Sequence, residues 1–319
     1  MVFLSKAGNL RNSFYLFLTA FIWGIAFVFQ SMGNDYMQPF TFNASRNLLG
    51  CLVLLPLVLI KIKKPGFLSS DPNAEKQKIS WKTTITGGIL CGLALATASM
   101  FQQYGVKYTS VGKAGFITTL YIILTPIFGL FLKKKCSWTV WVGAAAAVVG
   151  MYLLCVTEGF SVSFGDFLVF ICAIFFSVQI LFIDHFSPKT DGVILSCIQF
   201  SVGAVTCGII ALIIERPTID QLQNGLIPIL YTGIMSSGVA YTLQIIGQRN
   251  FNPTIAAMIM SLESVISAVA SVIAYNLGFL STDQSLTGVQ ILGCAIMFAA
   301  IIFVQLPIEN WLKAKKINK

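Results

Sequence analysis

The sequence predicts an all-α polytopic membrane protein with ten transmembrane helices, arranged as two five-helix repeats of opposite orientation. Three observations predict this class. Charged residues make up only 10% of the chain and apolar residues 56%, whereas soluble domains carry about 25% charged residues. Apolar runs longer than 18 residues recur throughout the chain, and each can cross the roughly 30 Å hydrocarbon core as a helix. The two halves also share an internal similarity.

The apolar runs define the expected spans. Pro39 and Pro253 lie just inside two of the helix starts, where the missing N–H costs little. Lys6 and Arg11 precede the first run without a small-residue cleavage site after it, so we expect a retained helix and not a signal peptide. The expected spans are 13–33, 38–60, 83–104, 110–132, 138–156, 164–184, 191–214, 225–247, 253–277 and 286–306.

The placement of basic residues predicts the orientation. With the N-terminus inside, the outer segments collect only Lys107, Lys113 and Arg216 of the 21 Lys and Arg, and Arg46 lies within a span. Because cytoplasmic segments carry the excess of Lys and Arg, both termini are expected in the cytoplasm of an inner-membrane protein. Residues 307–319 would then form a basic cytoplasmic tail. The net charge of +9 therefore indicates membrane insertion and not nucleic-acid binding.

An internal repeat relates the two halves. At a shift of 142 residues, 101–120 aligns with 243–262, so that Gln102 meets Gln244. The shift is 150 farther along and 153 near the start, and the drop from 153 to 142 is explained by a long loop at 61–82 whose counterpart at 215–224 is short. These weaker alignments place 141–150 over 291–300 and 19–25 over 172–178.

A repeat of five spans must enter the membrane the second time upside down, because five is odd. We therefore expect a first repeat at residues 1–156 and an inverted second repeat at 157–306. Inverted repeats are common in secondary transporters, where the substrate site lies near the midplane between the copies. By analogy, this architecture favours a transporter.

Several stretches follow one another in a characteristic order: FIWGIAFVFQ (21–30), TFNASRNLLG (41–50), YTSVGKAGFITTLYIILTPIFG (108–129), WVGAAAAVVG (141–150), GDFLVFICAIFFSVQILFIDHF (165–186) and AYTLQIIGQRNFNPTIAAMIMSLE (240–263). In this order the chain resembles the EamA-type branch of the drug/metabolite transporter superfamily over nearly its whole length. The resemblance implies ten helices, a central cavity and export of small organic solutes, commonly driven by the proton gradient.

The chain departs from the pattern of this family at two places. The family usually reads L-E-P-V where residues 262–265 read LESV, and the missing proline predicts a straighter ninth helix. An acidic residue that is frequent in the family after the fourth and ninth helices is replaced at 133–135 and 278–279. We expect this loss to alter gating within the same class of protein.

Two charged residues inside the spans are candidates for function. Glu263 is the only acidic residue deep in an apolar run. A carboxylate at the bilayer centre costs about 2.5 kcal/mol or more, so it should face a cavity or a partner. Low dielectric favours its neutral form, which makes it a candidate proton carrier; the alternative is a structural carboxyl within the bundle. Arg46 either binds an anionic group of the solute or locks its helix to a neighbour.

Uncharged side chains complete the expected cavity. Gln102 and Gln244 suit polar solutes, or they bond across helices for about 1 kcal/mol each. Trp23 and Tyr121 offer a flat apolar wall, although packing alone also accounts for aromatic residues. The full set expected around the substrate is Trp23, Arg46, Gln102, Tyr121, Gln179, Tyr241 and Gln244, with Glu263 coupling protons.

The sequence predicts no catalytic residue, metal site or cofactor. Its eight cysteines are scattered, mostly in apolar runs, where cysteine acts as a small hydrophobe, and the lone His185 has no second ligand in view. Lys113, at the outer start of the fourth span, is expected at a cavity mouth or, more simply, in contact with water. The expected driving force is the proton gradient.

Small residues predict close helix contacts. Gly143, Ala147 and Gly150 form a small-x-x-x-small face on the fifth span, and Gly293 opens another on the tenth. Close packing of neighbouring helices is the direct interpretation. A homodimer through the fifth and tenth helices is the alternative.

The leading functional hypothesis is an exporter of small metabolites, such as amino acids or related compounds, that works by alternating access within the lipid bilayer. A flippase for a lipid-linked substrate is the main alternative, favoured by a cavity open sideways to lipid. A membrane-embedded enzyme would need a Ser/His pair, an Asp dyad or a His/Glu cluster, and the spans contain none. A channel would need a ring of like charges or a glycine-rich filter.

Overall fold

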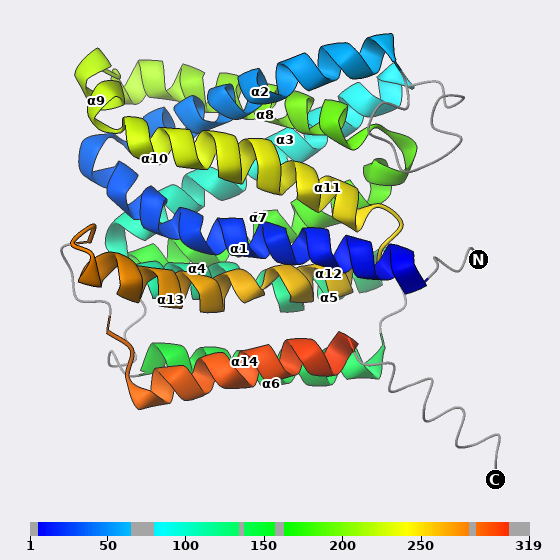
Figure 1. Cartoon of the computed structure of the whole chain (residues 1–319), viewed down its shortest axis with the longest axis vertical. Helices are drawn as coiled ribbons and strands as arrows, with labels where there is room; N and C mark the ends of the chain where they lie inside the picture. The colour runs from blue at the N-terminus through cyan, green and yellow to red at the C-terminus, as the bar shows by residue number, and fades with distance from the viewer. Residues whose placement is uncertain (1–5, 65–79, 134–136, 157–162, 281–284, 306–319) are drawn as a thin grey trace.

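The structure, a computed structural model, consists in its described part mainly of helices (Figure 1). Within its described part, eight helices are long and apolar enough to cross a membrane. Two shorter apolar helices, with apolar stretches Trp138–Gly150 and Gly288–Ala300, stand where the fifth and tenth spans are predicted. The predicted basic tail lies outside the described residues, which are 6–64, 80–133, 137–156, 163–280 and 285–305.

The helices begin and end within a few residues of the predicted spans, except that the first extends from residue 6. The first half contains α1 (Lys6–Tyr36), α2 (Pro39–Lys63), α3 (Trp81–Tyr108), α4 (Val111–Thr118), α5 (Tyr121–Phe131) and α6 (Trp138–Val156). The second half contains α7 (Phe164–Phe186), η2 (Ser187–Lys189), α8 (Gly192–Ile210), η3 (Ala211–Glu215), α9 (Ile219–Asn224), α10 (Leu226–Leu230), η4 (Tyr231–Tyr241), α11 (Thr242–Gln248), α12 (Pro253–Met260), α13 (Leu262–Asn276) and α14 (Gly288–Gln305).

The fourth and ninth predicted spans are each interrupted near the middle. α4 ends before Thr119, whose hydroxyl donates to the Phe116 carbonyl at 2.8 Å. α12 ends before Ser261, whose hydroxyl donates to the Met258 carbonyl at 2.7 Å. Hydroxyls that bond back to their own helix compete with its backbone ladder and bend it. The straighter ninth helix expected from the missing proline is therefore wrong.

The helices pack in layers that bring the two halves of the chain together. α2 packs along α8, and α6 packs along α14; these pairs form the upper and lower edges of Figure 1. Between the edges, α1 contacts α13, η4 and α11, while α3 contacts α7 and α8. Nearly every large contact therefore joins the first half of the chain to the second.

Glycines permit the closest of these approaches. A Cβ on Gly150 of α6 would lie 2.6 Å from the carbonyl oxygen of Gly293 on α14. A Cβ on Gly165 of α7 would lie 2.8 Å from the carbonyl oxygen of Gly105 on α3. The predicted small-residue faces of the fifth and tenth spans thus pack against each other within one chain.

Carboxylates stabilise the starts of α2 and α8. Glu215, at the end of η3, accepts hydrogen bonds from the backbone N–H groups of Phe40 and Thr41, at 3.0 and 2.7 Å. Asp191 caps α8 and forms an ion pair of 2.8 Å with Lys61, near the end of α2. Both carboxylates satisfy free N–H groups at the positive end of a helix.

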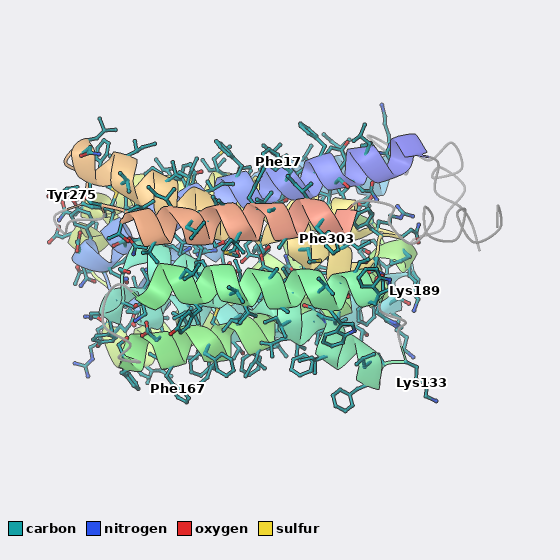
Figure 2. All side chains as sticks on the ribbon, turned by 90° about the horizontal axis from the view of Figure 1, so that it is seen from below. Phe17, Lys133, Phe167, Lys189, Tyr275 and Phe303 are labelled. Atoms are coloured by element: carbon teal, nitrogen blue, oxygen red, sulfur yellow. The ribbon has the colours of Figure 1, made fainter. Side chains whose placement is uncertain are left out.

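The outer surface of the bundle is apolar along the helices. Large apolar side chains such as Phe17 on α1 and Phe167 on α7 are exposed and point outward (Figure 2). Lys133 and Lys189, both predicted on the inner side, lie at the same end of the molecule, and Tyr275 lies at the other (Figure 2). An apolar girdle with basic residues gathered at one end is the form expected of a membrane-spanning bundle.

Candidate functional site

A pocket lies in the interior of the bundle, between helices of both halves. None of its lining residues is more than 8% exposed, so the pocket is closed to the surroundings in this conformation. Its walls come from α1, α2, α3, α4, α5, α7, η4, α11 and α13. The lining residues are Trp23, Phe27, Gln30, Arg46, Gln102, Thr118, Tyr121, Phe176, Ile180, Ser236, Tyr241, Gln244 and Glu263.

A hydrogen bond between Tyr121 and Glu263 spans the pocket wall. The Tyr121 hydroxyl donates to Oε1 of Glu263 at 2.9 Å, and both side chains are buried. The residues follow the interruptions of the fourth and ninth spans, at the start of α5 and of α13. Glu263 lies about 15 Å, ten residues at 1.5 Å each, from the first residue of α12, which is near mid-membrane depth.

Arg46 is the only cationic residue among those that line the pocket. It is the eighth residue of α2 and is 2% exposed. Its Nε and Nη1 atoms have no hydrogen-bond partner among the residues that the structure describes. The ion pairs found in the described ranges, Lys61–Asp191 and Lys113–Asp166, do not involve Arg46.

Buried amides lie in and beside the pocket wall. The amide groups of Gln179 on α7 and Gln244 on α11 bond to each other in both directions, at 3.4 and 3.2 Å. Gln102 on α3 donates to the hydroxyl of Thr118 on α4 at 3.3 Å. The two glutamines that align in the repeat thus face the same pocket with different partners.

Aromatic rings form one wall of the pocket. The rings of Trp23 and Tyr241 lie 4.5 Å apart, tilted by 53°, within the range of favourable aromatic pairs. Phe27 and Phe176 also line the pocket. The Nε1 atom of Trp23 has no hydrogen-bond partner in the described part of the chain.

The structure brings the residues predicted for the site together. Seven of the eight line the pocket, and the eighth, Gln179, contacts it through Gln244. Arg46 and Glu263 line the same pocket without forming an ion pair with each other. The expectation that Lys113 simply reaches water is wrong, because Lys113 pairs with Asp166 at 2.7 Å and its side chain is 14% exposed.

Sequence reasoning missed six of the lining residues. Gln30, Thr118 and Ser236 are polar residues within apolar runs, and that signal could have marked them. Phe27, Phe176 and Ile180 give no such signal, because apolar residues dominate every span.

No group of three or more His, Cys, Asp or Glu side chains that could hold a metal ion occurs among the residues described. His185 lies at the end of α7 with Lys189, whose Nζ is 2.9 Å from Nε2 of the histidine. The chemistry of the pocket is therefore that of hydrogen bonding, one cation and one carboxyl group.

Comparison with known proteins gives a consistent picture. A model of the EamA-like transporter family matches residues 11–156 and again residues 163–306. An "Uncharacterized transporter" of Archaeoglobus fulgidus is 30% identical over 300 residues, covering 92% of this chain and 85% of that protein. "Uncharacterized transporter YcxC" of Bacillus subtilis is 22% identical over 307 residues, covering 92% of both.

The fold also has a relative among solved structures. A structure described only as "Crystal structure of protein" superposes with a TM-score of 0.67. The two share 17% identity, over 97% of this chain and 99% of the other. At this level of identity the likeness concerns the fold alone.

Proposed function

This chain belongs to the EamA-like transporter family, and on that premise we propose that it exports small organic metabolites by alternating access, with proton coupling through Glu263. The family and its relatives make the chain a multi-pass membrane transporter and not an enzyme. Amino acids and related compounds are the proposed solutes. The observation that carries the proposal is a closed, polar pocket at the junction of the two halves, with a buried carboxyl group in it.

The proposed architecture is ten spans in two inverted repeats, residues 1–156 and 157–306. The family model supports it by matching each half separately. The interruptions of the fourth and ninth spans support it too, because they are separated by 142 residues, which is the shift of the sequence repeat. An odd number of spans in each repeat gives the halves opposite orientations.

The contacts between helices add a third line of support. In the proposed repeat, α1 corresponds to α7, and α3 corresponds to η4 and α11 together. The contact of α3 with α7 therefore corresponds to the contacts of η4 and α11 with α1, and both sets of contacts occur. Likewise the contact of α3 with α8 corresponds to that of η4 with α2, and the contacts of α1 with α13 and α12 correspond to those of α7 with α5 and α4. The pairs α2–α8 and α6–α14 exchange with themselves, as expected of helices beside a two-fold axis.

The proposed orientation in the inner membrane has both termini in the cytoplasm. The excess of Lys and Arg on the predicted inner side supports it. The variants Lys64→Cys and Lys133→Cys should react with an impermeant thiol reagent from the cytoplasmic side only, and Lys107→Cys from the outside only. Reaction of residues 64 and 133 on opposite faces would contradict the inverted repeat.

A small solute is favoured over a lipid-linked one. A flippase substrate needs a cavity that opens sideways to the acyl chains, whereas every residue lining this pocket is buried. A homodimer would have to use the outer faces of α6 and α14, such as Trp141 and Leu292, because their small-residue faces pack together. The expected partners are thus a solute and the bilayer.

Proton coupling is proposed to occur at Glu263 because a buried carboxyl can alternate between a neutral and a charged form during the cycle. Its hydrogen bond to Tyr121 links the two halves of the chain at one point. A change in protonation would therefore act where the halves must separate. No cofactor enters this scheme.

To test the function, proteoliposomes loaded with a mixture of amino acids would be assayed for efflux by mass spectrometry, with and without a pH gradient. We expect efflux of a subset of the mixture, accelerated by the gradient. The variant Glu263→Gln should lose the acceleration, whereas Asp35→Asn, at an exposed carboxylate, should keep it. Efflux that ignores the gradient, or a normal response in Glu263→Gln, would refute proton coupling; no efflux at all would refute amino acids as the solutes.

A further inference from the structure

We propose that Arg46 and the indole N–H of Trp23 form an anion subsite, which binds a carboxylate group of the transported solute. The inference rests on the proposed function, because it takes the pocket to be the place where solute binds. It adds the chemical class of the solute, an organic monocarboxylate, and assigns the residues that recognise it.

The first argument is that buried donors face the pocket without acceptors. Nε and Nη1 of Arg46 and Nε1 of Trp23 lack a hydrogen-bond partner in the described ranges. The two residues are 2% and 8% exposed, and both line the pocket. Burying a charge without an acceptor costs free energy. An anion that accepts hydrogen bonds from these donors would offset that cost.

Four carboxylates of the bundle already have other partners. Glu215 accepts bonds from the start of α2, and Glu263 accepts from Tyr121. Asp166 and Asp191 are paired with lysines. An ion pair that locks Arg46 to another helix would require one of these carboxylates, and each is bonded elsewhere. The Tyr241 side chain on η4 also interacts with Arg46, but a neutral phenol does not balance the charge of the guanidinium.

The charge balance of the pocket favours a carboxylate over a phosphate. Among the lining residues Arg46 supplies one positive charge, and Glu263 is the one acidic group. A phosphate monoester carries roughly −1.5 to −2 at neutral pH, which one guanidinium would leave partly unpaired in a buried site. A carboxylate carries a single charge and matches the planar fork of arginine.

The wall beside Arg46 suits an apolar body attached to that carboxylate. The rings of Trp23 and Tyr241 lie together at 4.5 Å, and Phe27 and Phe176 extend the apolar lining. A solute with an anionic head and an apolar remainder would satisfy the donors and bury its apolar surface on the rings.

The second repeat supplies a matched control. Gln199 is the eighth residue of α8, as Arg46 is of α2, and it is fully buried. Its amide also lacks a partner among the described residues, but it does not line the pocket. The two positions therefore share burial and distance from the start of equivalent helices, and differ in charge and in access to the pocket.

The test measures binding of defined probes to the purified full chain in detergent by calorimetry. The probes are 3-phenylpropanoate, its neutral analogue 3-phenylpropanamide and inorganic phosphate. We expect 3-phenylpropanoate to bind the unmodified protein most tightly, and Arg46→Gln to weaken it at least tenfold. Trp23→Phe should weaken it a few-fold, and Gln199→Met should leave it unchanged. The amide should bind the protein and Arg46→Gln equally weakly.

Other results would overturn the subsite. These are no binding of 3-phenylpropanoate, equal binding to Arg46→Gln, or equal loss in Gln199→Met. Phosphate that competes with 3-phenylpropanoate at similar concentration would overturn the carboxylate assignment. Binding is measured separately from efflux, so the two proposals can fail separately. Binding of 3-phenylpropanoate without efflux would refute the proposed transport alone. Efflux together with unchanged binding to Arg46→Gln would refute the subsite alone.

Thermal unfolding distinguishes a role of Arg46 in solute recognition from a role in the stability of the fold. We expect Arg46→Gln to melt at or above the temperature of the unmodified protein, because it removes a buried charge that lacks an acceptor. Arg46→Lys keeps the positive charge but lacks the planar guanidinium. Its affinity for 3-phenylpropanoate should lie between those of the unmodified protein and Arg46→Gln. A large loss of stability in Arg46→Gln, or failure to fold while Arg46→Lys folds and binds normally, would make Arg46 a structural residue and overturn the proposal.

Discussion

Glu263 and Tyr121 occupy corresponding positions in the two halves of the chain, 142 residues apart, and they meet in the pocket. Each follows a Ser or Thr that interrupts its span by bonding back to the preceding turn. The repeat thus places a donor and an acceptor opposite each other at the centre of the bundle. An aromatic hydroxyl can donate a hydrogen bond to a buried carboxyl group without forming an ion pair with it.

This hydrogen bond predicts an effect of Tyr121→Phe on the pH dependence of transport. The Tyr121 hydroxyl donates to the Glu263 carboxyl, so its removal should move the pH at which gradient-driven efflux is half-maximal, by up to about one unit. The measurement is efflux from proteoliposomes over a pH series. Tyr231→Phe is the matched control, because it removes a hydroxyl that donates to the Ile22 carbonyl outside the pocket. If the pH of half-maximal efflux is unchanged in Tyr121→Phe, this hydrogen bond plays no part in proton coupling.

The sequence predicted Glu263 for a physical reason, since a carboxylate deep in an apolar run is conspicuous and must be accommodated. It suggested Tyr121 only as part of an apolar wall, because its hydroxyl bond depends on how two distant spans meet. The six lining residues that were missed illustrate the same limit. Local composition can mark an unusual residue, but the facing partner depends on packing.

At the scale of helices, the most extensive contact between the halves is that of α3 with α7. Gly105 and Gly165 allow the backbones to approach so far that a Cβ on either would reach the other's carbonyl oxygen within 2.9 Å. The start of α7 is fixed at the same place by a capping box between Ser163 and Asp166. This crossing sets the position of Phe176 and Ile180 in the pocket wall.

Gly165→Ala is predicted to destabilise the fold. The new Cβ would lie 2.8 Å from backbone atoms of Gly105 and Tyr108, which cannot rotate away, and overpacking of this kind costs about 1–3 kcal/mol. Thermal unfolding in detergent would measure the loss. Gly208→Ala on α8 has only a distant neighbour, Ala44 at 4.0 Å, and should be neutral or slightly stabilising. Equal melting of the two variants would contradict the tight crossing.

The helices were predictable from hydrophobicity because membrane spans must be long and apolar, and most ends agree within a few residues. The interruptions at Thr119 and Ser261 were not predictable in this way. A hydroxyl that bonds to its own helix leaves the apolar run unbroken in the sequence. The missing proline gave the opposite expectation for the ninth span, because back-bonding by serine can interrupt a helix without proline.

Across the whole molecule, the two ends of the bundle are closed by unequal contacts. At the proposed outer end, Asp166 at the start of α7 pairs with Lys113 at 2.7 Å and accepts from the Thr109 hydroxyl at 2.6 Å. At the corresponding place at the inner end, Asn12 of α1 donates to the Arg249 carbonyl at 3.2 Å. A buried ion pair with an added hydrogen bond resists opening more than one neutral bond does. At this pair of equivalent positions the outer contact should therefore resist opening more than the inner one, although the inner end also carries the Lys61–Asp191 ion pair between α2 and α8.

Asp166→Asn should shift the molecule toward an outward-open state. Removing one partner of a buried ion pair costs about 3–5 kcal/mol, and this loss falls on the closed outer end, where Lys113 would lose its pair with Asp166. Gln30 lines the pocket six residues before the end of α1. With Asp166→Asn, an impermeant thiol reagent applied outside should label Gln30→Cys at least about tenfold faster. Labelling of the native cysteines alone sets the background.

Asp191→Asn is the control for this shift, because it breaks the other buried ion pair, with Lys61, at the opposite end of the bundle. If the outer contact alone holds the outer end shut, Asp191→Asn leaves the labelling of Gln30→Cys at its original rate. If both variants speed labelling equally, the effect is a general loosening of the bundle. If neither does, the Lys113–Asp166 pair is not what closes the outer end, and the closure must come from the apolar packing of α4 and α13 beside it.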